Sequence, residues 1–206
     1  PLLLPEPLEL PVQQALVLQR HVPELERLGL LIEPFGPSSF LIRSLPVTHT
    51  EASMPYYAKG DSVLLYSGNE ATGTTADIYS LRLSNGAETP LSALPAVEEY
   101  YPITRDDTSF YFTRWYSSDN HNDQVYLGFY NGRPATRLAF NETNQNYSDA
   151  CPVSNRYLVV SSTTPGGRGG YDLYVADLIT GKRWSMDLYL KGINTNKNEL
   201  GACYSE

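Results

Sequence analysis

The tripeptide Asp172-Leu-Tyr174 ends the stretch Pro165-Gly-Gly-Arg-Gly-Gly-Tyr-Asp-Leu-Tyr174, and similar tripeptides stand twice earlier in the chain. The earlier copies are Asp77-Ile-Tyr79 and Gln124-Val-Tyr126. The tyrosines of successive copies stand 47 and then 48 residues apart. Repeats of this length, with several short strands in each copy, are typical of β-propeller blades. The repeat therefore decides the predicted fold of most of the chain.

Each repeat predicts four antiparallel strands. The first strand follows acidic or amide residues, and the second is an apolar, β-branched or aromatic run of the kind that forms a buried strand. A polar loop rich in Gly or Asn leads to the third strand, which opens with the tripeptide and ends in a Gly-containing turn. The predicted first strands span 51–57, 98–103 and 148–153, the second strands 62–67, 109–114 and 156–161, and the fourth strands 88–91, 135–140 and 183–188.

The predicted fold class is mainly β: a partial β-propeller of about three four-stranded blades, preceded by a small α/β segment. A single four-stranded sheet cannot bury both faces, so each blade depends on its neighbours. Natural propellers close with about four to eight blades. Two expectations therefore stay open: the chain is part of a longer protein, or two copies complete one ring. The predicted domains are 1–47 and 48–206, with blades at about 50–95, 96–147 and 148–198 and the start of a further blade at 199–206.

The third repeat resembles the TolB-type, WD-like propeller repeat of bacterial envelope proteins. The resemblance rests on the Gly-rich stretch 165–174, on Gly192-Ile-Asn-Thr-Asn196 and on Glu199. The first turn of each repeat departs from that family, which usually has Asp-Gly there. The resemblance implies recognition of a protein or a glycan rather than catalysis, and a location in the periplasm or cell envelope.

The first 47 residues differ in composition from the rest. They contain no Tyr, Lys or Asp and hold eight of the fifteen prolines. The pattern predicts a strand over 2–10, a helix over 12–28 that Pro23 splits or kinks, and two strands over 30–34 and 39–45. This predicts a small α/β unit.

That segment resembles the start of the regulatory part of the C-terminal domain of MutL, a mismatch-repair protein. The matching stretches are Leu25-Glu-Arg-Leu-Gly29, Ile32-Glu-Pro-Phe-Gly36 and Phe40-Leu-Ile-Arg-Ser-Leu-Pro46, besides the start of the chain. The resemblance implies that the opening stretch docks on the replication sliding clamp, and it implies no catalytic residue. The residues that resemble the clamp motif are Leu2, Leu3, Leu4 and Pro5.

The two resemblances meet between Pro46 and Thr50 with no Gly/Ser linker between them. A composite chain, or chimera, is the favoured interpretation. A natural fusion with a similar-looking α/β module is the alternative.

Charge and hydropathy exclude some functions. The formal net charge is −8, and no Lys/Arg cluster provides the positive surface that phosphate binding needs. Direct nucleic-acid binding is therefore not expected. The longest apolar run, Leu28–Ile32, is far too short to span a bilayer.

The candidate binding residues lie on the predicted rim of the blades. Exposed aromatic side chains beside Asn and Asp suit a sugar- or peptide-binding face, whereas most aromatic residues of the repeats are expected to pack in the blades. The loop Asp119-Asn-His-Asn-Asp123 is interpreted as a solvated loop, with a cation site as the less favoured alternative. The run 166–170 is predicted to be a flexible rim loop. The candidates are Trp115, Tyr116, Asp119, His121, Asp123 and Arg168.

No catalytic residue, metal ligand or cofactor is predicted. Glu98 and Glu99 are neighbours in a strand, so their side chains point to opposite faces and cannot act as one acid pair. Cys151 and Cys203 occupy equivalent positions in successive repeats, and two buried thiols are preferred over a disulfide.

The leading hypothesis is a non-catalytic propeller module that binds a protein or a glycan in the bacterial cell envelope. The alternatives are a MutL-like mismatch-repair piece that binds the sliding clamp or dimerises in the cytoplasm, and a polysaccharide-processing propeller enzyme.

Overall fold

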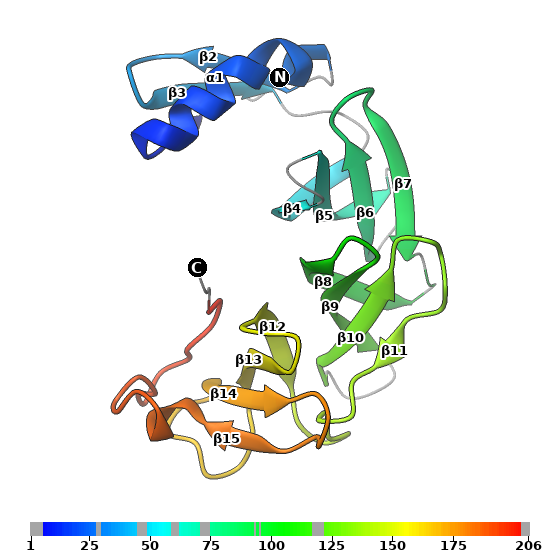
Figure 1. The fold of residues 1–206 in the computed structure, drawn as a ribbon, viewed down its shortest axis with the longest axis vertical. Coiled ribbons are helices and arrows are strands. Elements are labelled where there is room, and N and C mark those ends of the chain that lie inside the picture. The colour runs from blue at the N-terminus through cyan, green and yellow to red at the C-terminus, as the bar shows by residue number, and fades with distance from the viewer. Residues whose placement is uncertain are drawn as a thin grey trace.

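The structure is a computed structural model that describes residues 6–27, 30–44, 49–58, 62–70, 75–92, 94, 96–116 and 122–202. These residues form one three-stranded and three four-stranded antiparallel sheets. The three larger sheets follow one another along an arc, with their first strands on its concave side (Figure 1). The chain is mainly β with a partial propeller, as the repeat predicts.

Each four-stranded sheet is one blade, and its strands pair in chain order. The second strand of the middle blade shows why these segments form blades: six of its eight residues are buried. Blade 1 contains β4 (His49–Ala58), β5 (Val63–Glu70), β6 (Ala76–Arg82) and β7 (Ala87–Ser92); blade 2 contains β8 (Val97–Asp106), β9 (Ser109–Tyr116), β10 (Gln124–Phe129) and β11 (Thr136–Arg137); blade 3 contains β12 (Tyr147–Pro152), β13 (Tyr157–Ser162), β14 (Asp172–Asp177) and β15 (Arg183–Ser185).

Two hydrophobic cores lie between neighbouring blades. The core between blades 1 and 2 brings Leu65 and Ile78 against Phe110 and Phe112. The core between blades 2 and 3 joins residues of both blades in the same way: Tyr111, Val125, Phe140, Tyr147, Leu158, Val160 and Tyr174. The blades therefore stabilise one another by burying their facing apolar surfaces.

In blades 2 and 3, a repeated pair of hydrogen bonds joins the third strand to the connection that follows the blade. The amide of Asn141 accepts from the backbone N–H of Val125 and donates to its carbonyl. Asn194 does the same with Leu173. Both side chains are buried, so their amides satisfy backbone groups that water does not reach.

Two predicted fourth strands are longer than the observed ones. Residues 135–140 were expected to form a strand, but β11 has two residues, because the chain turns at Leu138 and buries Phe140 between the blades. Residues 183–188 form the three-residue β15 followed by a 3₁₀ helix, η1 (Met186–Leu188). The Ser185 hydroxyl caps this helix by accepting from the N–H of Asp187 at 3.3 Å.

The Gly-rich run 166–170 is held by hydrogen bonds and lies against another backbone segment. The backbone N–H groups of Arg168 and Gly169 donate to Oδ2 of Asp172 at 2.9 and 3.1 Å. A Cβ atom on Gly169 would lie 1.7 Å from the carbonyl oxygen of Lys197. The run therefore contains glycine because another backbone segment lies directly against it.

The small α/β unit contains β1 (Glu6–Glu9), α1 (Val12–Arg27), β2 (Leu31–Pro34) and β3 (Ser39–Ser44), with β3 at the centre of its sheet. Its core includes Ala15, Leu25, Ile32 and Phe40. The carbonyl of Pro11 accepts the N–H of Ala15, and the helix continues through Pro23 instead of ending there. No helix in the described ranges is long and apolar enough to cross a membrane.

Candidate functional site

The candidate site lies where the first strands of the blades are bulged. The pairing register shifts between Ser53 and Tyr56 in β4, between Tyr100 and Ile103 in β8, and between Ser148 and Cys151 in β12. A bulge inserts an unpaired residue and changes the direction of a side chain, and bulges are common beside functional sites. The same device therefore recurs at one position of all three blades.

Two of the bulge residues have left-handed backbone conformations. Tyr101 has φ of 55° and Asp149 has φ of 52°. Asp tolerates this region better than most residues, whereas a bulky aromatic residue rarely adopts it. The surrounding packing has to hold Tyr101 there, and such strained residues concentrate at functional sites.

Asp123 joins blades 2 and 3. Its carboxylate accepts hydrogen bonds from the hydroxyl of Tyr100 on β8 and, at 3.0 Å, from the hydroxyl of Tyr171 just before β14. Its backbone N–H donates to Oδ1 of Asn146 at 2.7 Å. Asp123 is thus fixed by contacts from both blades.

A pocket of about 380 Å³ opens beside this carboxylate. Its wall includes the two tyrosines that bind Asp123, the bulge residues Tyr101 and Asp149, and Ser67 and Ala76 from blade 1. A second pocket of about 290 Å³ shares Tyr101 and Asp149 with the first. All three blades therefore contribute to one site next to the bulged strands.

The site is electrostatically negative. Burial raises the pKa of Asp149 to about 6, and the charge of Asp123 raises it further, although a hydrogen bond from the Gly201 backbone opposes both effects. Burial and the nearby carboxylates also raise the pKa values of the Tyr100, Tyr101 and Tyr171 hydroxyls. Neutral phenols therefore stand beside two carboxyl groups, and no Lys or Arg is among the described residues that line the larger pocket.

This arrangement is suited to binding. The carboxyl groups accept hydrogen bonds, and the tyrosines present aromatic surface together with hydroxyl groups. The described lining residues include no His or Cys that would activate a nucleophile. Within the described ranges, no group of three or more His, Cys, Asp and Glu side chains is placed to hold a metal ion.

The structure places the predicted binding residues apart. Asp123 lies in the pocket. Trp115 and Tyr116 end β9, where Tyr116 packs against the core between blades 1 and 2. Arg168 is exposed and forms an ion pair of 3.1 Å with Asp187. Asp119 and His121, like the clamp-motif candidates Leu2, Leu3, Leu4 and Pro5, lie outside the described residues.

The sequence did not single out Asp149, Tyr101 or Tyr171 as site residues. Tyr101 belongs to the aromatic residues of the second repeat, most of which were expected to pack in the blades, and Tyr171 belongs to the Gly-rich stretch that predicts the fold. Tyr101 and Asp149 share one signal, their equivalent positions in successive repeats, whereas Tyr171 has none.

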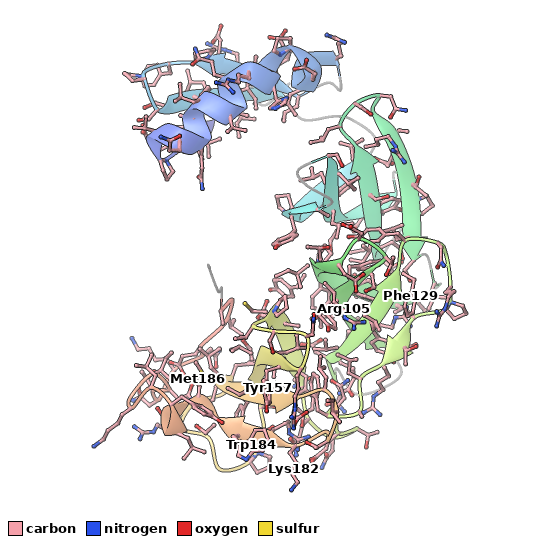
Figure 2. All side chains as sticks on the ribbon, in the orientation of Figure 1. Arg105, Phe129, Tyr157, Lys182, Trp184 and Met186 are labelled. Carbon is pink, nitrogen blue, oxygen red and sulfur yellow. The ribbon has the colours of Figure 1, made fainter. Side chains whose placement is uncertain are left out.

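Cys151 is buried beside Val159 and Leu173, and Met186, labelled in Figure 2, packs against this cluster. This position agrees with the preferred interpretation of a buried small side chain. Cys203 lies outside the described residues, so a bond between the two stays untested.

The blades have the fold of a partial β-propeller that is similar to TolB structures, with a pocket beside its bulged strands. TolB from Acinetobacter baumannii is similar to this chain with a TM-score of 0.54 and 17% identity, covering 75% of this chain and 36% of its own. A TolB-type structure from Agrobacterium tumefaciens is similar with a TM-score of 0.57 and 16% identity, covering 78% and 57%. A puromycin-hydrolyzing peptidase from Mycobacterium tuberculosis is similar with a TM-score of 0.55 and 15% identity, covering 71% and 23%.

The chain thus spans less than two thirds of the length of each of these structures. The family model of the MutL C-terminal dimerisation domain matches residues 1–56. No curated protein matches the chain. Both resemblances inferred from the sequence are therefore found again, each in its own part of the chain.

Proposed function

We propose that this chain is a non-catalytic β-propeller binding module that recognises a protein or a glycan in the bacterial cell envelope. The observation that carries the proposal is the pocket in which Asp123 is held by Tyr100 and Tyr171. Aromatic surface next to fixed hydrogen-bonding groups is the usual composition of a recognition site. The contact surface is this pocket, extended by the rim candidates Trp115 and Tyr116.

Binding arrays of glycans and of short peptides test the proposal. We expect the chain to bind members of one array, and Tyr171→Ala to weaken that binding at least tenfold because it removes a pocket wall and a donor to Asp123. Tyr189→Ala is the matched control, since Tyr189 is 64% exposed and is not a pocket residue. Absence of any binder, or equal binding by Tyr171→Ala, contradicts the proposal.

The non-catalytic part of the proposal has its own test, since one structurally similar protein is a peptidase. The described pocket residues support binding because they include no His or Cys to form an activated nucleophile. We expect no turnover of peptide amides, nitrophenyl glycosides or polysaccharides by the chain. Turnover that Asp123→Asn abolishes would make the site an active site.

The periplasm or cell envelope is the proposed location, supported by the resemblance of the blades to TolB-type repeats. Fractionation of the source cells tests it. Recovery in the cytoplasmic fraction would favour the MutL-like alternative.

A second candidate function is favoured by the family match over residues 1–56: self-association, or clamp docking, through the α/β unit. Phe35 is 68% exposed on this unit, and Ile179 is 74% exposed on blade 3. Sedimentation of Phe35→Asp and Ile179→Asp separates two kinds of dimer. Loss of a dimer only in Phe35→Asp supports association through the α/β unit, whereas loss only in Ile179→Asp supports closure of a ring by two sets of blades.

Clamp docking is tested separately by a pull-down with the replication sliding clamp as bait, in which the parent chain is compared with Leu3→Ala. Binding by the parent chain and loss in the variant support it. No binding by the parent chain removes it.

A further inference from the structure

Asp149 is a buried carboxyl group with an unsatisfied oxygen. The residue is 7% exposed, and its Oδ2 atom has no hydrogen-bond partner of normal geometry among the described residues. It lines both pockets. Buried polar groups are nearly always paired, because an unpaired carboxylate in a protein interior costs several kcal/mol. The Ser161 hydroxyl and the Gly201 backbone N–H face this carboxyl group, but no cation of the described residues does, so its charge is left for a ligand to balance.

We propose that the pocket binds a cationic side chain of a protein partner, a lysine ammonium or an arginine guanidinium group, with Asp149 as its counter-ion. This inference rests on the proposed binding function and names the chemistry of its ligand.

The charges around the pocket favour a cation over a neutral hydroxyl group. Asp123 is the second carboxyl group of the site, and its two oxygens already accept from tyrosine hydroxyls. The Asp149 carboxyl takes part in no ion pair of the described part of the chain, and no Lys or Arg is among the described lining residues of either pocket. A ligand cation would interact with both carboxyl groups in a partly desolvated site, where charge interactions are stronger than in water.

The tyrosines provide a second reason. Tyr100 and Tyr101 lie edge to face with ring centroids 5.2 Å apart, and Tyr101 lines both pockets. Ammonium and guanidinium groups bind over aromatic rings as well as beside carboxylates. Carboxyl groups and aromatic rings, the two components of such a site, are therefore present in the same pocket.

The neighbouring blade interface shows the same combination with its cation in place. Glu99 is fully buried and pairs with Arg114 at 2.6 Å. The Arg114 guanidinium lies 4.4 Å from the ring centroid of Tyr126. Between blades 1 and 2 the chain provides carboxylate, cation and ring, whereas at Asp149 it provides the carboxylate and the rings.

The pH dependence follows from the groups that face Asp149. These are Asp123 before β10, Tyr101 on β8 and Tyr171 before β14, together with the Ser161 hydroxyl on β13 and the Gly201 backbone. The tyrosines remain neutral over the range of interest because their pKa values are raised. The pKa of Asp149 is about 6, so a proton competes with the ligand cation below that pH. Affinity is expected to be about tenfold lower at pH 5 than at pH 7.

The experiment is calorimetric titration of the whole 206-residue chain with blocked tripeptides Ala-Lys-Ala and Ala-Arg-Ala, and with Ala-Lys-Ala whose lysine is acetylated. We expect the lysine or the arginine peptide to bind, and the acetylated peptide to bind at least tenfold more weakly. Asp149→Asn should lower the affinity at least tenfold and abolish its pH dependence. Asn tolerates the same left-handed conformation, so this variant is expected to fold.

Asp107→Asn is the charge-matched control, since Asp107 is exposed in the turn between β8 and β9. It should bind like the parent chain, and circular dichroism should show the same fold for all variants. Equal binding of the acetylated peptide, or unchanged binding by Asp149→Asn, overturns the inference. Binding of a neutral glycan that Tyr171→Ala abolishes, with no binding of either cationic peptide, overturns this inference and leaves the proposed function standing. Failure of every glycan and peptide overturns both.

Discussion

Replacing Arg114 by Met is expected to destabilise the protein strongly, because it leaves a buried carboxylate without its cation. Glu99 is 0% exposed and Arg114 is 5% exposed. Arg114 donates from Nε and Nη2 to one oxygen of Glu99, at 2.7 and 2.6 Å, and the same oxygen accepts from the Ser92 hydroxyl at 2.7 Å. Ser92 belongs to β7 of blade 1, so the pair joins the last strand of one blade to the next blade.

The expected loss is about 3–5 kcal/mol of the free energy of unfolding, which is the usual cost of removing one partner of a buried ion pair. For a chain of this size each kcal/mol corresponds to about 2–4 °C in melting temperature, so a fall of roughly 6–20 °C is expected. The stacking of the Arg114 guanidinium on Tyr126 is partly retained by the Met side chain. Most of the loss therefore comes from the carboxylate left behind.

The loss should depend on pH. Burial raises the pKa of Glu99 above its ordinary value of 4.5, and Arg114 is the largest influence that lowers it. Without Arg114 the folded-state pKa rises further, and a raised carboxyl pKa destabilises the fold increasingly as pH rises above 4.5. The variant should therefore be closest to the parent protein near pH 5 and furthest from it at pH 8.

Urea denaturation followed by circular dichroism and by tryptophan fluorescence, to which Trp115 beside Arg114 contributes, measures the change. The double variant Glu99→Leu/Arg114→Met should recover most of the lost stability, because replacing both partners with apolar residues is often neutral. Arg105→Met is the control: the Arg105 side chain, labelled in Figure 2, is 34% exposed and lies 3.7 Å from Asp106, so a much smaller loss is expected. A double variant less stable than Arg114→Met would refute the reasoning.

Three further predictions concern single positions. Gly128→Ala places a Cβ atom 2.4 Å from the Phe110 ring, so a loss of about 1–3 kcal/mol in the free energy of unfolding is expected in urea denaturation. The control Gly36→Ala, whose nearest contact is at 3.4 Å, should change that free energy by no more than about 0.5 kcal/mol. Equal effects of the two variants would contradict the packing argument. Asn194→Ala removes two hydrogen bonds to the backbone of β14 and should cost about 1–3 kcal/mol; an unchanged melting temperature would show that the amide is dispensable. Asp149→Asn should be more stable than the parent chain at pH 8, and the stability difference should shrink toward pH 5. The reason is that a carboxyl pKa raised to about 6 destabilises the fold as pH rises through that value. A stability difference that does not depend on pH would contradict the raised pKa of Asp149.

The repeat was enough to predict the blades because its signals are local. The tripeptides lie at the start of β10 and β14 and one residue inside β6, and their central residue is buried in each blade. The opposite directions of Glu98 and Glu99 also followed from strand geometry alone. Glu98 accepts the N–H of Ala76, whereas Glu99 pairs with Arg114. The spacing of the repeats and the alternation of side chains within a strand can both be read directly from the sequence.

The pocket could not be predicted in the same way, because its residues come from all three blades. Asp149 and Asp123 stand 26 residues apart, and whether they meet depends on bulges that have no fixed sequence signal. The short fourth strands were missed for a related reason. Burial of Phe140 between blades outweighs the strand preference of 135–140, and this competition is decided by tertiary contacts.

The junction of the two parts shows how sequence similarity and physical domains can differ. The match to the MutL C-terminal dimerisation domain extends to residue 56, which is within β4. Yet β4 pairs along its length with β5, and Ala58 at its end packs against Leu65 in the core between blades 1 and 2. Hydrogen bonds and burial thus assign β4 to blade 1, while the matched sequence runs into it from the α/β unit. Because the family match and the strand pairing assign β4 to different parts, the predicted boundary near residue 47 is best tested by expressing 49–206 alone. Folding of that piece with the melting temperature of the whole chain would make the α/β unit an independent module, and its failure to fold would make the unit part of the first blade's support.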